Sequence, residues 1–434
     1  MSGGRTLIAL LILVGGAGAL FSGAPIFSRF LYLGLLLMVS GWLWTAWIAR
    51  GLRVRRRARL TRVTVGEIFE EHFEVTNRTR LIAPWVEVAN KSRVPFASGS
   101  RLLTLLRGKQ KRQYLARSWL QRRGGYELGP TLLTVGDPFG LFRVTRRFPP
   151  EQSLIVFPML IPIQSFISPP GVLPGGQVIR RKSFDITPHA AGVREYAYGD
   201  ALKRIHWPTS IRRGQLMVKE FEQDPQSEIW LMLDAQKNVH IEKPYAQSAA
   251  PADIAYATRL PKFQLPPSTL EYAITITASL AHYYLQHRRT VGFMSGGHSQ
   301  TMLSADRSER QEGKILETLA FIEADGELSL AALVEAQAGQ LPQGSSVILI
   351  TPTVQNELLA AVDDLRRRHL RPVVILLVAE SFGGMKGSEK LIRSLAERKT
   401  PVCPIYCDAD LSAALTGFAS QTVQEALPWQ KPRS

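Results

Sequence analysis

The sequence predicts three structural parts: an N-terminal transmembrane helical hairpin, a small all-β domain, and a doubly wound α/β domain. Three patterns support this division. Two long apolar runs open the chain, short alternating runs follow, and strands alternate with helices over the second half. The predicted boundaries are residues 1–50, 51–157 and 223–434, with a linker at 158–192 and a densely charged segment at 193–222.

The two apolar runs extend from Thr6 to Leu20 and from Phe30 to Ala49. A membrane-spanning helix needs about 20 apolar residues. The second run has this length and carries three tryptophans toward its end. The first run is shorter and rich in glycine, so it is either the other half of a hairpin or a signal peptide cleaved near Ala19 or Ala24. The short distance between the runs favours the hairpin.

Positive charge is concentrated in the first third of the chain. Residues 1–150 contain 24 Lys and Arg against 7 Asp and Glu, whereas residues 151–434 contain 29 of each. A run of bases without an acid follows the second apolar run: Arg53, Arg55, Arg56, Arg57 and Arg59. The positive-inside bias predicts that this cluster and all later residues lie in the cytoplasm, anchored to the inner membrane by a multi-pass hairpin. We expect the cluster to face anionic lipid headgroups; nucleic acid is the competing explanation, which the adjacent membrane helix disfavours.

The region from Leu60 to Phe157 reads as short strands separated by Asn, Gly and Pro, which is typical of a β-sandwich or barrel. The stretch from Arg101 to Arg123 holds eight Lys and Arg and no acid, so one face should be basic. That face would lie against the membrane or meet an acidic partner. Residues 158–192 are rich in Pro and Gly and are expected to form a linker or surface loop.

The second half begins with a continuous apolar strand, Ile229 to Asp234, that ends in an acid. Such strands are buried on both faces of a parallel sheet, and ligands of these sheets bind beyond the carboxyl ends of the strands. Two cysteines, Cys403 and Cys407, fall in the last predicted strand. No second pair completes a zinc site, so we interpret them as small buried residues of a reducing compartment.

The segment 193–222 combines acids, many bases, a tryptophan and turn glycines. Its key residues are Arg194, Glu195, Tyr196, Gly199, Asp200, Arg204, His206, Trp207, Arg213 and Lys219. This segment resembles the signature of the domain of unknown function 58 family, and the block from Arg122 to Arg143 resembles the strand and turn that precede it. The resemblance implies a bacterial protein in which the signature segment (residues 193–222) leads into a von Willebrand factor A-like domain. It implies no established biochemical activity.

Two interpretations of the signature segment remain open. In the first, Glu195 and Asp200 pair with arginines to hold an extended arm, and Trp207 is its apolar anchor. In the second, the segment is a docking surface in which Arg and Trp dominate, as they do at interface hot spots. The two interpretations are compatible.

The A-like resemblance also implies a metal site, which typically begins with a D-x-S-x-S loop after the first strand. Here the loop reads Asp, Ala, Gln, Lys, Asn from Asp234, and Thr351 stands where a further acid is expected. The residues left to hold Mg²⁺ are Asp234, Gln236 and Thr351. The lysine and the missing hydroxyls favour a degenerate loop without metal.

The leading hypothesis is therefore a non-enzymatic, membrane-anchored cytoplasmic scaffold or adaptor. The family resemblance suggests a MoxR-type AAA+ ATPase and a membrane transglutaminase-like protein as partners. One alternative is a Mg²⁺-dependent protein-binding module. Another is a hydrolase that uses Asp200 and His206, although Ser295 and His298 lack a nucleophile elbow and residues 383–387 lack the spacing of a phosphate-binding loop.

Overall fold

The computed structural model describes residues 3–167, 190–196, 205–221, 228–245, 263–297 and 300–426. The chain forms two compact units, which we describe separately. The first consists mainly of Met1–Met159, and the second mainly of the residues from Leu160 onward.

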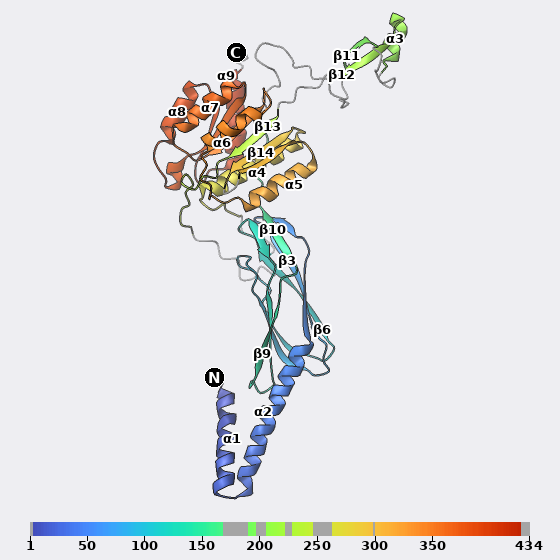
Figure 1. The fold of residues 1–434 in the computed structure, drawn as a ribbon, viewed down its shortest axis with the longest axis vertical. Helices are drawn as coiled ribbons and strands as arrows, with labels where there is room; N and C mark the ends of the chain where they lie inside the picture. Colours follow the sequence, from blue (N-terminus) through green and yellow to red (C-terminus); the bar gives the residue numbers. More distant parts are fainter. Residues whose placement is uncertain are drawn as a thin grey trace, which may run out of the picture. The chain divides into compact units, whose positions relative to one another are not determined.

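Two antiparallel helices open the first unit: α1 (Gly3–Phe21) and α2 (Pro25–Gly51) (Figure 1). Both are long and apolar enough to cross a membrane. They approach closely at glycines, since a Cβ added to Gly15 would lie 2.6 Å from the backbone nitrogen of Leu31. Small residues at such contacts let two apolar helices pack backbone to backbone. The first apolar run is thus a helix paired with the second.

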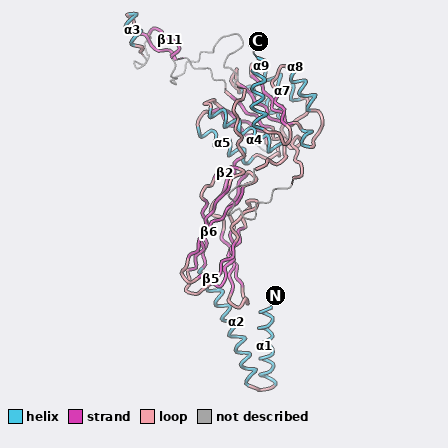
Figure 2. The backbone as a smooth tube through the Cα atoms, turned by 180° about the vertical axis from the view of Figure 1, so that it is seen from behind, coloured by secondary structure: helices cyan, strands magenta, loops and turns pink. Residues whose placement is uncertain are grey.

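The β-domain of the first unit contains three small sheets. Figure 2 shows its strands in magenta, with β2, β5 and β6 labelled. One sheet has the order β1-β3-β6, formed by Leu52–Ala58, Ile68–Asn77 and Lys111–Trp119. A second has the order β5-β4-β8-β9, formed by Arg101–Leu106, Ala83–Asn90, Thr131–Gly136 and Arg143–Phe148. The third has the order β2-β10-β7, formed by Arg62–Thr64, Ser153–Phe157 and Gly124–Glu127. Only the β10–β2 pair is parallel in this domain's described residues.

Alternating apolar residues of the first two sheets form one core. Phe73 of β3, Val86 of β4 and Leu133 of β8 are fully or almost fully buried in it. The end of α2 joins the same core through Ile48 and Ala49. The helix and the β-domain are therefore packed together, and removing the last turn of α2 would remove part of the domain's core.

The second unit contains an α/β region with a six-stranded mixed sheet of order β15-β14-β13-β16-β17-β18. The strands are Gln300–Asp306, Val291–Gly296, Ile229–Leu233, Ser346–Thr351, Arg371–Leu377 and Val402–Ile405 in that order. All neighbouring pairs are parallel except the edge pair β14–β15. The predicted alternation of strands and helices is confirmed at this level.

Helices cover both faces of this sheet. Those on one face are α6 (Leu330–Gln337), α7 (Glu357–Arg367) and α8 (Ser388–Glu397), which bury the side chains of Met232, Leu349 and Val374. Alternate strand residues point to the other face, where α4 (Thr269–Gln286) packs on the central strands and α9 (Leu411–Ala426) on β18. The remaining long helix is α5 (Glu309–Phe321), and short 3₁₀ turns span Ala338–Gln340 and Ala379–Phe382.

The expected linker at 158–192 is partly packed. Residue Ile161 donates its backbone N–H to Ser279 Oγ of α4 at 2.9 Å, and Tyr284 of α4 donates its hydroxyl to the Ile167 carbonyl at 2.7 Å. Phe166 is buried between Tyr284 and Phe418. Residues 160–167 thus belong to the α/β region, and residues 168–189 lie outside the described part of the chain.

Candidate functional site

The signature segment forms a small hairpin with a helical turn. Strand β11 (Ala190–Glu195) pairs antiparallel with β12 (Met217–Phe221), with Glu195 opposite Met217. Between them, α3 (Trp207–Arg213) begins with Pro208 in its first turn and ends at Gly214. Gly214 has φ +66°, the left-handed conformation that favours glycine at a helix C-terminus. The sequence thus encodes both ends of this short helix.

A buried serine joins the helix to the strand. Ser210 Oγ accepts the backbone N–H of Met217 at 2.8 Å and donates to the His206 carbonyl at 3.0 Å. The backbone N–H of His206 donates to the Met217 carbonyl at 2.8 Å. The buried side chains around this junction are those of Ile205, Met217 and Val218. In the part of the hairpin whose side chains the structure describes, the helix and strand are therefore held by this polar junction and a small apolar cluster.

Among the described side chains of this module, two large apolar ones face solvent. Trp207 is 60 % exposed, and Ile211, one helical turn later, is 79 % exposed. Leu216 is exposed on the following turn, and the exposed bases Arg212 and Arg213 end the helix. Residues four apart lie on one helix face, so Trp207 and Ile211 form one apolar surface. We call Trp207, Ile211, Leu216, Arg212 and Arg213 the exposed face of the hairpin.

The structure describes only some of the predicted signature residues. His206, Trp207 and Arg213 lie in or beside α3, and Tyr196 donates its backbone N–H to the Leu216 carbonyl at 2.8 Å. Glu195 is the last residue of β11. Gly199, Asp200 and Arg204 lie outside the described residues, as do the side chains of Arg194 and Lys219. Ile211 and Leu216 were missed by sequence reasoning, although the four-residue spacing of Trp207 and Ile211 is visible in the chain.

The side chain of His206 contacts a neighbour in its own turn, and this contact does not form a catalytic arrangement. Its Nδ1 lies 2.7 Å from Thr209 Oγ1, three residues along the same turn. The expected Asp200–His206 pair of a hydrolase falls outside the described residues. Ser295 is buried within β14, and its hydroxyl has no hydrogen-bond partner among the described residues. A buried strand hydroxyl cannot reach a substrate, so Ser295 has a packing role.

The loop after β13 gathers polar side chains at the carboxyl end of the sheet. Asp234 is 2 % exposed; its Oδ2 accepts the Thr351 hydroxyl at 2.6 Å, and its Oδ1 accepts the Gln236 backbone N–H at 3.0 Å. His240 Nε2 lies 2.9 Å from the Asp234 carbonyl oxygen, and His240 Nδ1 lies 3.1 Å from Thr269 Oγ1. Because a carbonyl only accepts, Nε2 carries the proton. The predicted residues Asp234, Gln236 and Thr351 are therefore brought together.

This arrangement does not fit Mg²⁺. The ion prefers octahedral oxygen coordination, usually with carboxylates and waters. Both oxygens of the buried Asp234 carboxylate already accept protein hydrogen bonds, and Gln236 contributes its backbone N–H, which cannot bind a cation. No group of three or more His, Cys, Asp or Glu side chains with metal-binding geometry occurs among the described residues. The loop is better explained as a polar junction that holds β13 to β16.

Burial raises the pKa of Asp234 above its ordinary value, while the Thr351 hydroxyl, the His240 ring and the Gln236 amide act in the opposite direction. A carboxyl whose folded pKa is raised contributes less stability as pH increases through that pKa, because the folded state holds the proton more tightly. The variant Asp234→Asn lacks this dependence. We therefore expect the melting temperature of the variant minus that of the unmodified protein to become more positive between about pH 3.5 and pH 7.

Asp306→Asn is the matched control for that measurement, since Asp306 is only partly buried and has its pKa lowered by hydrogen bonds from Ser308 and Arg307. Its relative melting temperature should change with pH in the opposite direction. Thermal unfolding of the full chain in detergent measures both slopes. Parallel slopes for the two variants would contradict the buried, protonatable state of Asp234.

The two cysteines have no metal or disulfide partner among the described residues. Burial raises the pKa of Cys403 to about 12. Burial, followed by the neighbouring Asp408 carboxylate, raises the pKa of Cys407. Raised thiol pKa values reduce the thiolate that a nucleophile or metal ligand needs.

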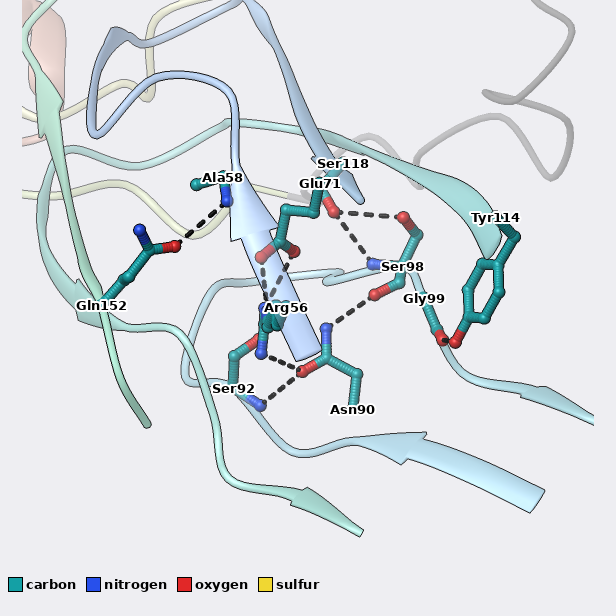
Figure 3. A network of polar contacts seen from close by, with 10 residues as sticks. All are labelled: Arg56, Ala58, Glu71, Asn90, Ser92, Ser98, Gly99, Tyr114, Ser118 and Gln152. Carbon is teal, nitrogen blue, oxygen red and sulfur yellow. Dashed lines mark hydrogen bonds and ion pairs between the residues drawn. The ribbon is translucent and has the colours of Figure 1, made fainter. Parts of the chain in front are cut away.

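Four of the predicted lipid-facing arginines lie on β1, where alternate side chains point to opposite faces, and Arg59 follows the end of this strand. Arg53, Arg55, Arg57 and Arg59 are exposed. Arg56 instead points inward: its Nε and Nη2 contact the Glu71 carboxylate at 2.5 and 2.8 Å, and its Nη1 donates to Asn90 Oδ1 at 3.0 Å (Figure 3). Arg56 is therefore unsuited to lipid contact. Glu71, its buried partner, was missed, although it occupies an inward position between Phe69 and Phe73.

Along strand β1 the arginines lie at increasing distances from the C-terminal end of α2. At about 3.4 Å per residue, Arg57 lies about 14 Å along the strand from Arg53, and Arg59 follows the end of the strand. Arg59 Nη1 is 3.3 Å from Glu70 Oε2. The pKa of the Glu74 carboxylate is lowered chiefly by the Gln113 side-chain hydrogen bond, and the positive charges of Arg55 and Arg57 lower it further. The run that looks continuous in sequence is thus spread along the domain and partly paired.

Comparison with known proteins bears on the signature segment. Residues 192–257 match the family described as protein of unknown function DUF58. The uncharacterised protein YeaD of Bacillus subtilis (strain 168) is 22 % identical to this chain over 222 residues, covering 50 % of this chain and 48 % of that protein. The chain thus spans about half the length of this curated relative.

Similarities to solved structures are weak. A CARDB domain from Pyrococcus furiosus, solved with di-metal ions, aligns at 15 % identity and a TM-score of 0.19, covering 24 % of this chain and 91 % of that chain. A complex of zinc 2-glycoprotein and prolactin inducible protein from human seminal plasma aligns at 10 % identity and a TM-score of 0.19, with 24 % and 92 % covered. Similarities at this level bear on neither fold nor function. The sequence matches, in contrast, show that residues 192–257 are similar to the DUF58 family and that the chain is similar to YeaD.

Proposed function

We propose that this protein is a membrane-anchored cytoplasmic adaptor that binds a protein partner through the exposed face of the hairpin. Helices α1 and α2 are its anchor, spanning the inner membrane twice, and the domains that follow lie in the cytoplasm. The close helix contact at Gly15 and the exposed bases that follow α2 support this arrangement. The α/β region, with the von Willebrand factor A-like order suggested by its sequence, is a second binding element.

The exposure of Trp207 is the observation that carries the proposal. A tryptophan that served only to anchor the hairpin would be buried in it, yet Trp207 is 60 % exposed. The structural role falls instead to Ser210, Met217 and Val218, which are buried. Tryptophan and arginine dominate interface hot spots, where an aromatic anchor fills a pocket and charged groups surround it. Trp207 beside Ile211, with Arg212 and Arg213 adjoining, has that composition.

The partner's chemistry follows from this face. It requires an apolar pocket for Trp207 and Ile211, bordered by carboxylates for Arg212 and Arg213. A MoxR-type AAA+ ATPase is the partner that the family resemblance suggests, and a membrane transglutaminase-like protein is a further member of the same assembly.

The test is capture of crosslinked partners from native membranes with the tagged full chain, quantified by mass spectrometry. Two hot-spot truncations of about 2 kcal/mol each should together reduce capture by well over tenfold. We therefore expect Trp207→Ala with Ile211→Ala to lose the AAA+ ATPase.

The matched control is Leu102→Ala with Leu105→Ala, which removes two apolar side chains that are 60 % and 66 % exposed on β5 of the β-domain, outside both proposed binding elements. It should retain the partner. Equal recovery with all three proteins, or no AAA+ ATPase with the unmodified chain, would reject the proposal.

A further inference from the structure

The loop that joins β8 to β9, residues 137–142, lies beside both N-terminal helices. A Cβ added to Gly41 of α2 would lie 3.4 Å from Phe142 Cδ2, and one added to Gly4 of α1 would lie 3.4 Å from Leu141 Cδ2. Arg5 of α1 donates from Nε to the Leu141 carbonyl, and its guanidinium lies 5.6 Å from the centre of the Phe142 ring. The loop is therefore held at one level along the helix pair, set by Gly4 and Gly41.

Several backbone polar groups of this loop are hydrogen-bonded within it. The buried Asp137 carboxylate accepts the N–H of Phe139 at 2.9 Å and that of Phe142 at 2.6 Å. The N–H of Gly140 donates to the Asp137 carbonyl at 3.2 Å, and Pro138 has no N–H to satisfy. An irregular segment enters an apolar environment only when its polar backbone is satisfied in this way.

The tip of the loop is apolar and exposed. Phe139 is 58 % exposed, whereas Leu141 is buried beside Gly4 of α1. Asp137 fixes the turn, and Gly140 adopts φ +71° within it. The loop thus presents a phenylalanine on a rigid turn, while its own carboxylate is turned inward.

The depth of the loop follows from the length of α2. From Pro25 to Gly41 the helix rises about 24 Å at about 1.5 Å per residue, less than the roughly 30 Å of a bilayer's hydrocarbon core. Trp42 and Trp47, exposed at 57 % and 62 %, lie just beyond Gly41. Tryptophans mark the membrane–water interface. A hairpin that spans the bilayer therefore places residues 137–142 at or just inside the interface that these tryptophans mark.

A second set of loops lies farther along, at the level where α2 ends. The N–H of Arg78 donates to the Gly51 carbonyl at 3.0 Å, and that of Lys109 donates to the Thr79 carbonyl at 2.9 Å. Four exposed bases occupy these loops: Arg78, Arg80, Arg107 and Lys109. Gly51 is about 15 Å beyond Gly41 along the helix. The bases therefore lie on the aqueous side of the tryptophans, where anionic headgroups attract them.

We propose that the β8–β9 loop inserts into the membrane interface, with Phe139 among the lipid chains and the bases of the 78–82 and 107–110 turns at the headgroups. The proposal rests on the membrane-spanning anchor of the proposed function. Insertion would fix the β-domain against the bilayer surface and would give the domain a defined orientation toward its partners.

The experiment measures lipid contact at single positions of the full chain in nanodiscs of phosphatidylethanolamine and phosphatidylglycerol. Cys403→Ala and Cys407→Ser provide a background without thiols, and an environment-sensitive fluorophore is attached after Phe139→Cys, Leu36→Cys or Leu60→Cys. Leu36 lies on the exposed surface of α2 and reports the anchor. Leu60, 59 % exposed beyond the far end of β1, matches Phe139 in exposure.

We expect a nitroxide near the lipid carbonyls to quench the probe at position 139 roughly threefold more than the probe at position 60, as contact with the interface requires. A nitroxide in the middle of the chains should quench the probe at position 36. Quenching at 36 with equal, low quenching at 139 and 60 would reject loop insertion and leave the anchor in place. Absence of quenching at position 36 would reject both the membrane-spanning anchor and the loop insertion that rests on it. Blue-shifted emission at 139 without quenching would identify a protein contact there and also overturn the proposal.

Discussion

Replacing Arg56 with methionine should lower the free energy of unfolding of the β-domain by about 3–5 kcal/mol, the usual cost of leaving one member of a buried ion pair without its partner. The Glu71 side chain is 2 % exposed and Arg56 9 % exposed, and they meet through two parallel N–H···O contacts. Arg56 also stacks 5.1 Å from the centre of the Phe73 ring and donates to Asn90. Methionine keeps much of the volume but leaves the Glu71 carboxylate buried and uncompensated.

The double variant Arg56→Met with Glu71→Leu should recover most of this loss, because an apolar pair of similar volume often replaces a buried ion pair at little cost. Arg57→Met is the control, since Arg57 is the next residue of the same strand and is exposed; we expect a change within about 0.5 kcal/mol. Pulse proteolysis in urea, with the full chain in detergent, measures all three. If Arg56→Met were as stable as Arg57→Met, the Glu71 carboxylate would not be buried as the structure indicates.

The same residues show what the sequence could and could not predict. Alternation in β3 identifies Phe69, Glu71 and Phe73 as inward positions, so the burial of Glu71 was accessible from the pattern. The pairing of Glu71 with Arg56 was not accessible, because it depends on the register between β1 and β3, which is fixed only in the folded sheet. The arginine run was assigned to lipid by its proximity to a helix. Side chains alternate between the two faces of a strand, so Arg56 of this run points inward and is part of the core.

In the signature segment, composition indicated a special region but not its exposed face. The helix boundaries at Pro208 and Gly214 are encoded locally by residues with strong positional preferences. Whether Trp207 is core or surface depends on what else fills the hairpin, and Ser210 with Met217 does so. In the α/β region, apolar runs predicted the strands because both faces of the sheet are covered. The hydrogen bond from Thr351 to Asp234 depends on the β13–β16 pairing and was not predictable from either residue.

Replacing Ser210 with valine should unfold the signature hairpin while leaving the α/β region intact. Valine is close to serine in size but removes the acceptor for the Met217 N–H and the donor to the His206 carbonyl. A buried donor left unsatisfied costs about 1–3 kcal/mol. The described residues of the hairpin bury few apolar side chains, namely Ile205, Met217 and Val218, so a loss of this size removes much of its stability.

Hydrogen exchange of the full chain is the measurement, because the amides of Tyr196, His206 and Met217 donate within the hairpin. Protection of these amides should fall by roughly tenfold to a hundredfold, corresponding to that free energy, while amides of β13 and β16 remain unchanged. Thr209→Val is the control: among the described residues its hydroxyl bonds to the partly exposed His206 ring alone, so protection should persist. Unchanged exchange with Ser210→Val would mean that something other than this junction holds the hairpin. The comparison also separates folding from docking, because Trp207→Ala should leave the same amides protected while it weakens partner capture.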